Sequence, residues 1–116
     1  MGKQSYHEKL KSLMDRLVNK IYDVTKEFPR SETFGLTSQI RRSSLSIILN
    51  YIEGYARRRK NVLKNFLEMS YGSLKETKYL ISFSHGRKYL NKTDHDNLTA
   101  IVEEIGRMLW GTINKL

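Results

Sequence analysis

Apolar residues recur every three or four positions along most of the chain, and this spacing places them on one stripe of an α-helix. No segment alternates between apolar and polar residues over the length of a β-strand. The pattern therefore predicts an all-α fold. The clearest stripe runs from Ser5 to Phe28 and consists of Leu10, Leu13, Met14, Leu17, Val18, Ile21, Val24 and Phe28.

Four segments of this kind are separated by short polar stretches, and they predict helices at about 5–28, 36–59, 61–84 and 93–116. Four amphipathic helices with short connections are typical of an antiparallel up-down-up-down four-helix bundle. A chain of 116 residues is long enough for one hydrophobic core and too short for two. We therefore expect a single domain over residues 1–116.

Residues at the expected helix ends support these ranges. Ser5 followed by Glu8 has the spacing of a capping box at the first helix. Pro29 ends that helix because it disfavours the helical conformation of the residue before it. We expect Asn61 to cap the third helix and Gly86 to end it.

The second helix carries more apolar surface than the other helices of one bundle can cover. Its last third, SIILNYIEGY, is apolar on more than one face, which indicates a second burial surface. We therefore expect a homo-oligomer. The expected subunit contact consists of Ile48, Tyr51, Ile52, Glu53 and Tyr55.

Glu53 is the one carboxylate inside this apolar segment, and two interpretations of it are open. It has the spacing for an ion pair with Arg57 four residues later in the same helix. Alternatively, it is buried at the subunit contact and pairs with an arginine of the second helix. Neither interpretation gives it a catalytic role, since no second acid or base lies at a helical spacing that would partner it.

The charge of the chain is strongly positive and unevenly distributed. Twenty-one Lys and Arg residues against twelve Asp and Glu residues give a net charge of +9. Six of these nine charges fall between residues 41 and 64, where seven basic residues stand against Glu53 alone. Such clustering favours a polyanionic partner, RNA or DNA. The expected phosphate-binding residues are Arg41, Arg42, Arg57, Arg58, Arg59, Lys60 and Lys64.

The run Arg57–Lys60 also has a simpler interpretation. Cations at the end of a helix complement the negative end of its dipole, and the run would then be a solvated helix end. This explains one or two cations better than four in succession. Because the planar guanidinium of arginine matches phosphate oxygens, we favour phosphate binding for this run.

The sequence offers little for catalysis. No cysteine is present, the three histidines are far apart in sequence, and no Walker-type loop or di-iron helix motif occurs. A cluster of Asp94, His95 and Asp96 could ligate a metal, but after Thr93 it more simply forms the acidic start of the fourth helix. We therefore expect no enzyme, no catalytic or metal-ligating residue and no cofactor. We further expect a cytoplasmic protein without a membrane partner.

The middle of the chain resembles a known family. The string FPRSETFGLTSQIRRSSLSIILNYIEGYARR, followed by the FL and GSL of NFLEMSYGSL, resembles the bacterial four-helix-bundle proteins named after the intervening sequences of 23S ribosomal RNA. Relatives of that family include the accessory variability determinant of diversity-generating retroelements. The chain departs from the pattern at Ile48 and Leu49, where the family usually has Pro and Ser. The matching positions are Phe28, Pro29, Gly35, Leu36, Thr37, Ser38, Gln39, Ile40, Arg41, Arg42, Ser46, Ile47, Asn50, Glu53, Gly54, Tyr55, Arg57, Phe66, Leu67, Gly72, Ser73 and Leu74.

The resemblance implies a four-helix bundle that assembles into a ring, typically a homopentamer with a basic surface. Together with the charge, it predicts a non-enzymatic, oligomeric protein that binds RNA or DNA phosphates without strong sequence preference. The alternative is a protein-interaction scaffold, such as the accessory subunit of a retroelement reverse transcriptase. Salt-dependent binding to bare nucleic acid would distinguish the two.

Overall fold

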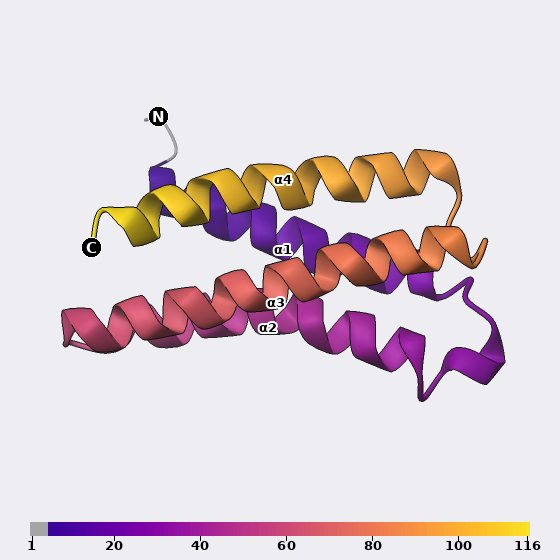
Figure 1. The fold of residues 1–116 in the computed structure, drawn as a ribbon, viewed down its shortest axis with the longest axis horizontal. Helices are drawn as coiled ribbons and strands as arrows, with labels where there is room; N and C mark the ends of the chain where they lie inside the picture. Colours follow the sequence, from indigo (N-terminus) through magenta and orange to yellow (C-terminus); the bar gives the residue numbers. More distant parts are fainter. Residues whose placement is uncertain (1–4) are drawn as a thin grey trace.

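The computed structural model describes residues 5–116, so the first four residues of the expected domain lie outside its described part. Within that part the chain forms four α-helices, one short 3₁₀-helix and no strand (Figure 1). The expectation of an all-α fold with four helices is confirmed. Within residues 5–116, no helix is both long enough and apolar enough to cross a membrane. The elements are α1 (Tyr6–Thr25), η1 (Arg30–Glu32), α2 (Leu36–Tyr55), α3 (Lys60–Gly86) and α4 (Lys92–Asn114).

The first two helices end earlier than their apolar patterns predict. α1 ends at Thr25 because the backbone N–H groups before Pro29 form turn-type bonds, such as that from Phe28 to the Thr25 carbonyl. α2 ends at Tyr55, and the N–H of Arg57 donates to the carbonyl of Gly54 across a similar turn. The run of four basic residues therefore lies in a connection and not in the last turn of α2.

The expected cap at Ser5 and the expected end of α3 at Gly86 are confirmed, whereas the expected cap at Asn61 is wrong. The Ser5 hydroxyl accepts a hydrogen bond from the N–H of Glu8, as the capping-box spacing predicts. α3 begins at Lys60 with Arg59 in the cap position, so Asn61 is not its cap. α4 begins at Lys92, ahead of Thr93, because Asn91 accepts a 2.7 Å bond from the N–H of Asp94.

The apolar stripes of the four helices meet in one core. Half of the eight residues in the stripe expected for the first helix are fully buried, namely Leu10, Met14, Leu17 and Ile21. α2 and α3 share the most extensive contact. α3 also packs on α4, α1 packs on α2, and α1 packs on α4, so each helix contacts two others. The core is therefore closed by contacts between α1 and α4 as well as by those between helices that follow each other in the chain.

Small polar residues line the contact between α2 and α3. The Ser70 hydroxyl donates to the Ile47 carbonyl at 2.7 Å, and the Thr77 hydroxyl donates to Oγ of Ser43 at 2.8 Å. Both hydroxyl groups are buried, and each has its hydrogen-bond partner on the facing helix or its own. Near the end of α2, a Cβ atom built on Gly54 would lie 3.0 Å from Cβ of Phe66. The two backbones can approach closely because the side chains between them are small.

A matched pair of glycine substitutions tests this close approach. Gly54→Ala places a methyl group against Phe66 and should lower the free energy of unfolding by about 1 kcal/mol, because overpacking costs more than the gain in helix propensity. Gly72→Ala lies within α3, and its new Cβ would have no atom of residues 5–116 within 4 Å apart from its chain neighbours and the backbone of its own helix. It should raise the free energy of unfolding by about 0.5–1 kcal/mol. Urea denaturation measures both, and a stabilised Gly54→Ala variant would contradict the packing described.

Candidate nucleic-acid interface

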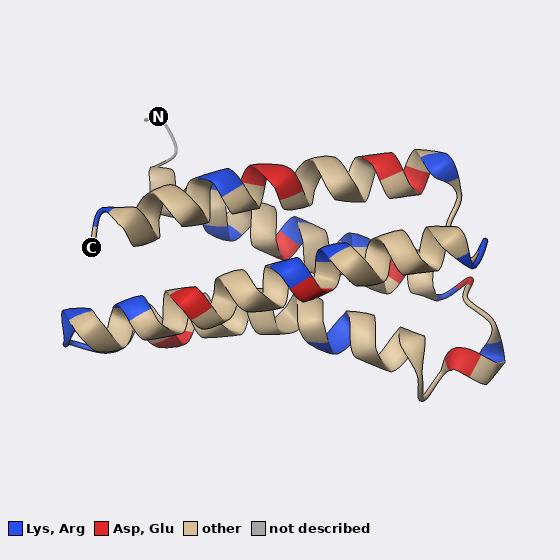
Figure 2. Ribbon diagram, viewed as in Figure 1, with Lys and Arg blue, Asp and Glu red and all other residues tan. Residues whose placement is uncertain are grey.

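Four of the expected phosphate-binding residues lie together at the connection between α2 and α3. We call Arg57–Lys60 the basic turn. All four of its residues are exposed, and Figure 2 shows the turn as a blue tip at the left end of the molecule. Arg57, Arg58 and Arg59 line a hollow of about 370 Å³ together with Val62 of the first turn of α3. The structure therefore concentrates three guanidinium groups around one depression.

The cations of the basic turn differ in how they are neutralised. Arg57 pairs with Glu53 at 3.3 Å, as their spacing of four residues predicts, although Arg57 itself lies just beyond the end of α2. Its guanidinium lies 5.3 Å from the Phe66 ring centroid. Within residues 5–116 no carboxylate lies within 4 Å of the charged nitrogens of Arg58, Arg59 or Lys60. These three side chains therefore have no ion-pair partner among residues 5–116.

The dipole of α3 does not explain these charges. Arg59 occupies the N-cap of α3 and Lys60 is its first residue, so both lie at the positive end of the helix. Cations are unfavourable there, whereas an anion is favourable. The interpretation of the run as a solvated end of α2 therefore applies at most to Arg57 and Arg58. Lys64 is exposed one turn into α3 and extends the positive surface along that helix.

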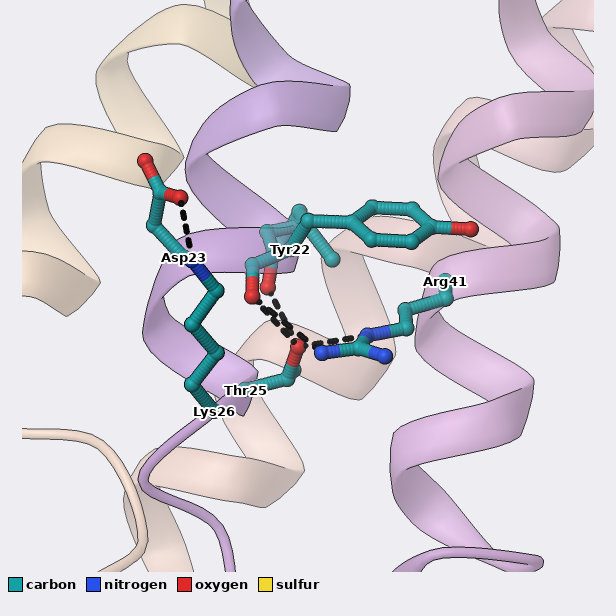
Figure 3. Close-up of polar contacts among 6 residues, drawn as sticks. Tyr22, Asp23, Thr25, Lys26 and Arg41 are labelled. Carbon is teal, nitrogen blue, oxygen red and sulfur yellow. Dashed lines mark hydrogen bonds and ion pairs between the residues drawn. The ribbon is translucent and has the colours of Figure 1, made fainter.

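Arg41 does not lie at the basic turn, and its side chain is already occupied (Figure 3). Its Nε donates to the Thr25 hydroxyl at 2.8 Å and its Nη2 donates to the Tyr22 carbonyl at 3.2 Å. The guanidinium also lies 4.5 Å from the Tyr22 ring centroid. Because α1 ends at Thr25, this cation lies at the negative end of that helix. We therefore assign Arg41 to the packing of α2 on α1, and its contact with phosphate stays a prediction.

Arg42 is exposed but also lies far from the basic turn. It lies on α2 thirteen residues before the end of that helix at Tyr55, a separation of about 20 Å along the axis. It lines a separate polar hollow of about 390 Å³ with Gln39, Ser43, Ser46 and Glu76. The two arginines of the RR pair thus have different surroundings from each other and from the basic turn.

The residues expected at a subunit contact fall into two groups. Tyr51 is 1% exposed, and its hydroxyl lies 2.6 Å from Nδ1 of His7, a hydrogen-bond distance. Burial, followed by the nearby Tyr55, raises the pKa of Tyr51. Tyr51 is therefore a core residue with no free surface for a second subunit, and Ile48 is partly buried against the same core. Ile52 and Tyr55 are 48% and 40% exposed, and Glu53 is exposed in its pair with Arg57.

Two leucines that the sequence analysis did not select lie on the same outer face of α2 as Ile52. Leu45 and Leu49 are 37% and 54% exposed. The intervals of four and three residues from 45 to 49 to 52 place these side chains on one stripe of the helix. We call Leu45, Leu49 and Ile52 the outer α2 stripe. The sequence signal for this stripe is the spacing of four and three residues between Leu45, Leu49 and Ile52, which is separate from the spacing of the core residues of the same helix.

The side chains of His95 and Asp96, in the acidic cluster at the start of α4, are engaged with neighbouring residues. Asp96 pairs with Lys92 at 2.7 Å and lies 3.0 Å from Nδ1 of His95. The hydrogen bonds from Lys92 and His95 lower the pKa of Asp96. Among residues 5–116 the structure gathers no group of three metal-ligating side chains. The cluster acts as the polar start of α4, whose first turn contains Asp94.

Comparisons with known proteins agree with this architecture. The model of the 23S rRNA-intervening sequence protein family matches residues 9–111. A crystal structure of a protein of unknown function from the S23 ribosomal protein family of Bacteroides thetaiotaomicron is similar to this chain. The two share 20% identity and a TM-score of 0.87, over 95% of this chain and 99% of the other. No curated protein matches. The family match covers most of the chain, and the chain therefore belongs to the 23S rRNA-intervening sequence protein family.

Proposed function

We propose that this chain is a cytoplasmic, non-enzymatic, oligomeric protein that binds RNA or DNA phosphates through the basic turn, without strong sequence preference. The observation that carries the proposal is the placement of Arg58, Arg59 and Lys60. These three exposed cations have no carboxylate within 4 Å among residues 5–116, and Arg59 and Lys60 lie at the positive end of α3. The family, named for an element of ribosomal RNA genes, supports a role connected with nucleic acid.

The stability of the fold does not account for the basic turn. Neighbouring like charges repel each other, and cations at a helix N-terminus oppose its dipole. Both costs disappear when a phosphate group binds, because its charge neutralises the cations and interacts favourably with the helix dipole. A bound polyanion would therefore compensate these two costs, which nothing among residues 5–116 of the folded monomer compensates.

The type of contact explains why we propose weak sequence preference. Arginine and lysine bonds to phosphate fix the position of a nucleic acid but do not read its bases. The basic turn is a short connection, and the base-reading elements of most sequence-specific proteins are helices or ribbons inserted in a groove. The proposed recognition is thus one of charge and backbone shape.

The outer α2 stripe supports the proposed assembly. Leu45, Leu49 and Ile52 form an exposed apolar row on α2, and a second subunit would remove it from water. Arg42 and Glu53 are exposed on the same helix and offer charges of opposite sign to a second copy. We propose that antiparallel four-helix bundles associate through this stripe into a ring, with five subunits as the expected number. A ring presents the basic turn several times to one nucleic acid and so increases its affinity.

Removal of the unpaired cations tests the nucleic-acid contact. We expect the triple variant Arg58→Gln, Arg59→Gln, Lys60→Gln to bind unrelated RNA and DNA sequences more weakly by similar factors. Each lost phosphate contact should reduce the slope of log affinity against log salt by about 0.7–0.9, a total of about two to three per subunit in contact. Fluorescence anisotropy of labelled oligonucleotides over a salt series measures both quantities.

The matched control removes three exposed cations at the opposite end of the bundle, Lys26→Gln, Arg30→Gln and Lys88→Gln. Net charge then changes equally, and the salt slope should stay close to that of the unmodified protein. Equal effects in the two triple variants would mean that binding follows net charge alone. Undetectable binding of the unmodified protein to bare nucleic acid would instead favour the scaffold alternative, in which the surface docks a partner such as a reverse transcriptase.

A charge in the outer α2 stripe tests the assembly. Leu49→Asp places a carboxylate without a partner in the proposed apolar contact, which typically costs several kcal/mol. Light scattering should show the unmodified protein at about five times the chain mass of 13.7 kDa and the variant near that mass. Circular dichroism should show unchanged helicity, because Leu49 is 54% exposed in the single chain.

Tyr79→Asp provides the control for this substitution. Tyr79 is 65% exposed on α3, outside the outer α2 stripe, so its variant should keep the mass of the assembly. If the unmodified protein is a monomer at micromolar concentration, the proposed ring is refuted. A Leu49→Asp variant that remains fully assembled would place the subunit contact elsewhere.

A further inference from the structure

The single tryptophan of the chain lies half-exposed on the surface formed by α3 and α4. Trp110 is 52% exposed, and its ring centroid lies 5.4 Å from that of Tyr71 on α3 at an interplanar angle of 41°. The ammonium group of Lys75 lies 5.2 Å from the centroid of the Tyr71 ring. Tyr71 therefore supports Trp110 from the side, and much of the indole remains open to solvent.

The charged residues around this aromatic pair are mostly cationic. Residues 60, 64, 71, 75 and 78 follow each other at intervals of four, seven, four and three, so they lie on one face of α3. Four of these five positions are lysines, and Tyr71 is the fifth. Glu68 is the one carboxylate of α3 beside this row. We call the four lysines with Tyr71 the α3 lysine row.

Across from this row, α4 adds one carboxylate and one further cation. Glu103 pairs with Lys78 at 2.6 Å. That hydrogen bond, with the charges of Lys75 and Arg107, lowers the pKa of Glu103 and keeps it ionised. The pair leaves Lys75 and Arg107 in excess near Trp110. The surroundings of Trp110 are therefore positive, unlike the uncharged outer α2 stripe.

We infer that Trp110 and Tyr71 form a stacking platform for an unpaired base of a single-stranded nucleic acid whose backbone follows the α3 lysine row. This inference rests on the proposed function and specifies the class of nucleic acid. Base stacking on an aromatic side chain combined with a positive backbone track is the usual chemistry of single-strand binding. An apolar protein partner on the same platform would have to approach through the surrounding ammonium and guanidinium groups, which a polyanion neutralises.

The geometry connects the platform with the basic turn. Lys60 belongs to the basic turn and begins the α3 lysine row, and Tyr71 lies eleven residues later on the same helix. The separation along the helix axis is about 16 Å. A stacked strand rises by about 3.4 Å per nucleotide, so about five nucleotides span the distance. A base inside a duplex is already stacked on its neighbours, and its faces are closed to the indole.

The intrinsic fluorescence of the unmodified protein tests the inference directly, because all tryptophan emission comes from Trp110. The probes are single-stranded oligothymidylate and oligouridylate of about 15 nucleotides and a mixed-sequence duplex of equal length. We expect both single strands to quench the emission and the duplex to leave it nearly unchanged. Anisotropy of the same labelled probes establishes independently that each one is bound.

Two substitutions of Trp110 separate stacking from apolar bulk. Trp110→Leu keeps an apolar side chain and should reduce single-strand affinity by roughly tenfold, while duplex affinity stays unchanged. Trp110→Phe keeps an aromatic face and should recover most of the loss. Phe83→Ala, which removes a 43% exposed ring elsewhere on α3, is the control and should change neither affinity.

The outcomes distinguish this inference from the proposed function. Single strands that bind without quenching Trp110, or equal losses in Trp110→Leu and Phe83→Ala, would overturn the platform and leave phosphate binding at the basic turn intact. Equal quenching by the duplex would overturn the single-strand assignment. Absence of binding by every probe in anisotropy would overturn the proposed function and the platform together.

Discussion

The close packing of α2 against α3 is the contact on which the rest of the structure depends. Small residues allow it, because Gly54 meets Phe66 and the hydroxyl groups of Ser70 and Thr77 find their acceptors inside the contact. The same packing brings the end of α2 beside the start of α3, so that the basic turn is a short and well-defined connection. A core formed without polar interior hydrogen bonds would bury α2 and α3 equally well but would not fix their register.

This packing divides α2 into surfaces with different roles. Its inner face supplies core residues such as Ile47 and Tyr51, whereas Leu49 and its neighbours face outward. Arg41, one turn before the outer stripe begins, bonds to the end of α1 and fixes the position of the whole helix against that neighbour. The proposed subunit contact and the bundle core thus lie on different faces of α2, and the basic turn begins just beyond its end.

Periodicity and charge predicted the fold class, four helices and a cluster of cations at residues 57–60, because these depend on local spacing. They placed most of that cluster in the second helix, which in fact ends at Tyr55. The outcome for Arg41 required tertiary information, since its acceptors lie on α1 and become available only where that helix ends at Thr25. The expected contact residues differed from the outer stripe for a related reason. Adjacent positions of a helix are about 100° apart, and whether Tyr51 or Ile52 faces the core depends on where α1 packs. The resemblance to the 23S rRNA-intervening sequence proteins, confirmed over residues 9–111, carried no such detail.

Amide hydrogen exchange of the unmodified protein, free and bound to RNA, tests most directly whether nucleic acid contacts the connection between α2 and α3. The first N–H groups of α3 have no acceptor within their helix and should exchange rapidly in the free protein. On binding, the account predicts slowed exchange across residues 56–64 and little change across the connection at 87–91 between α3 and α4. Protection confined to 87–91, with unchanged exchange at 56–64, would contradict it.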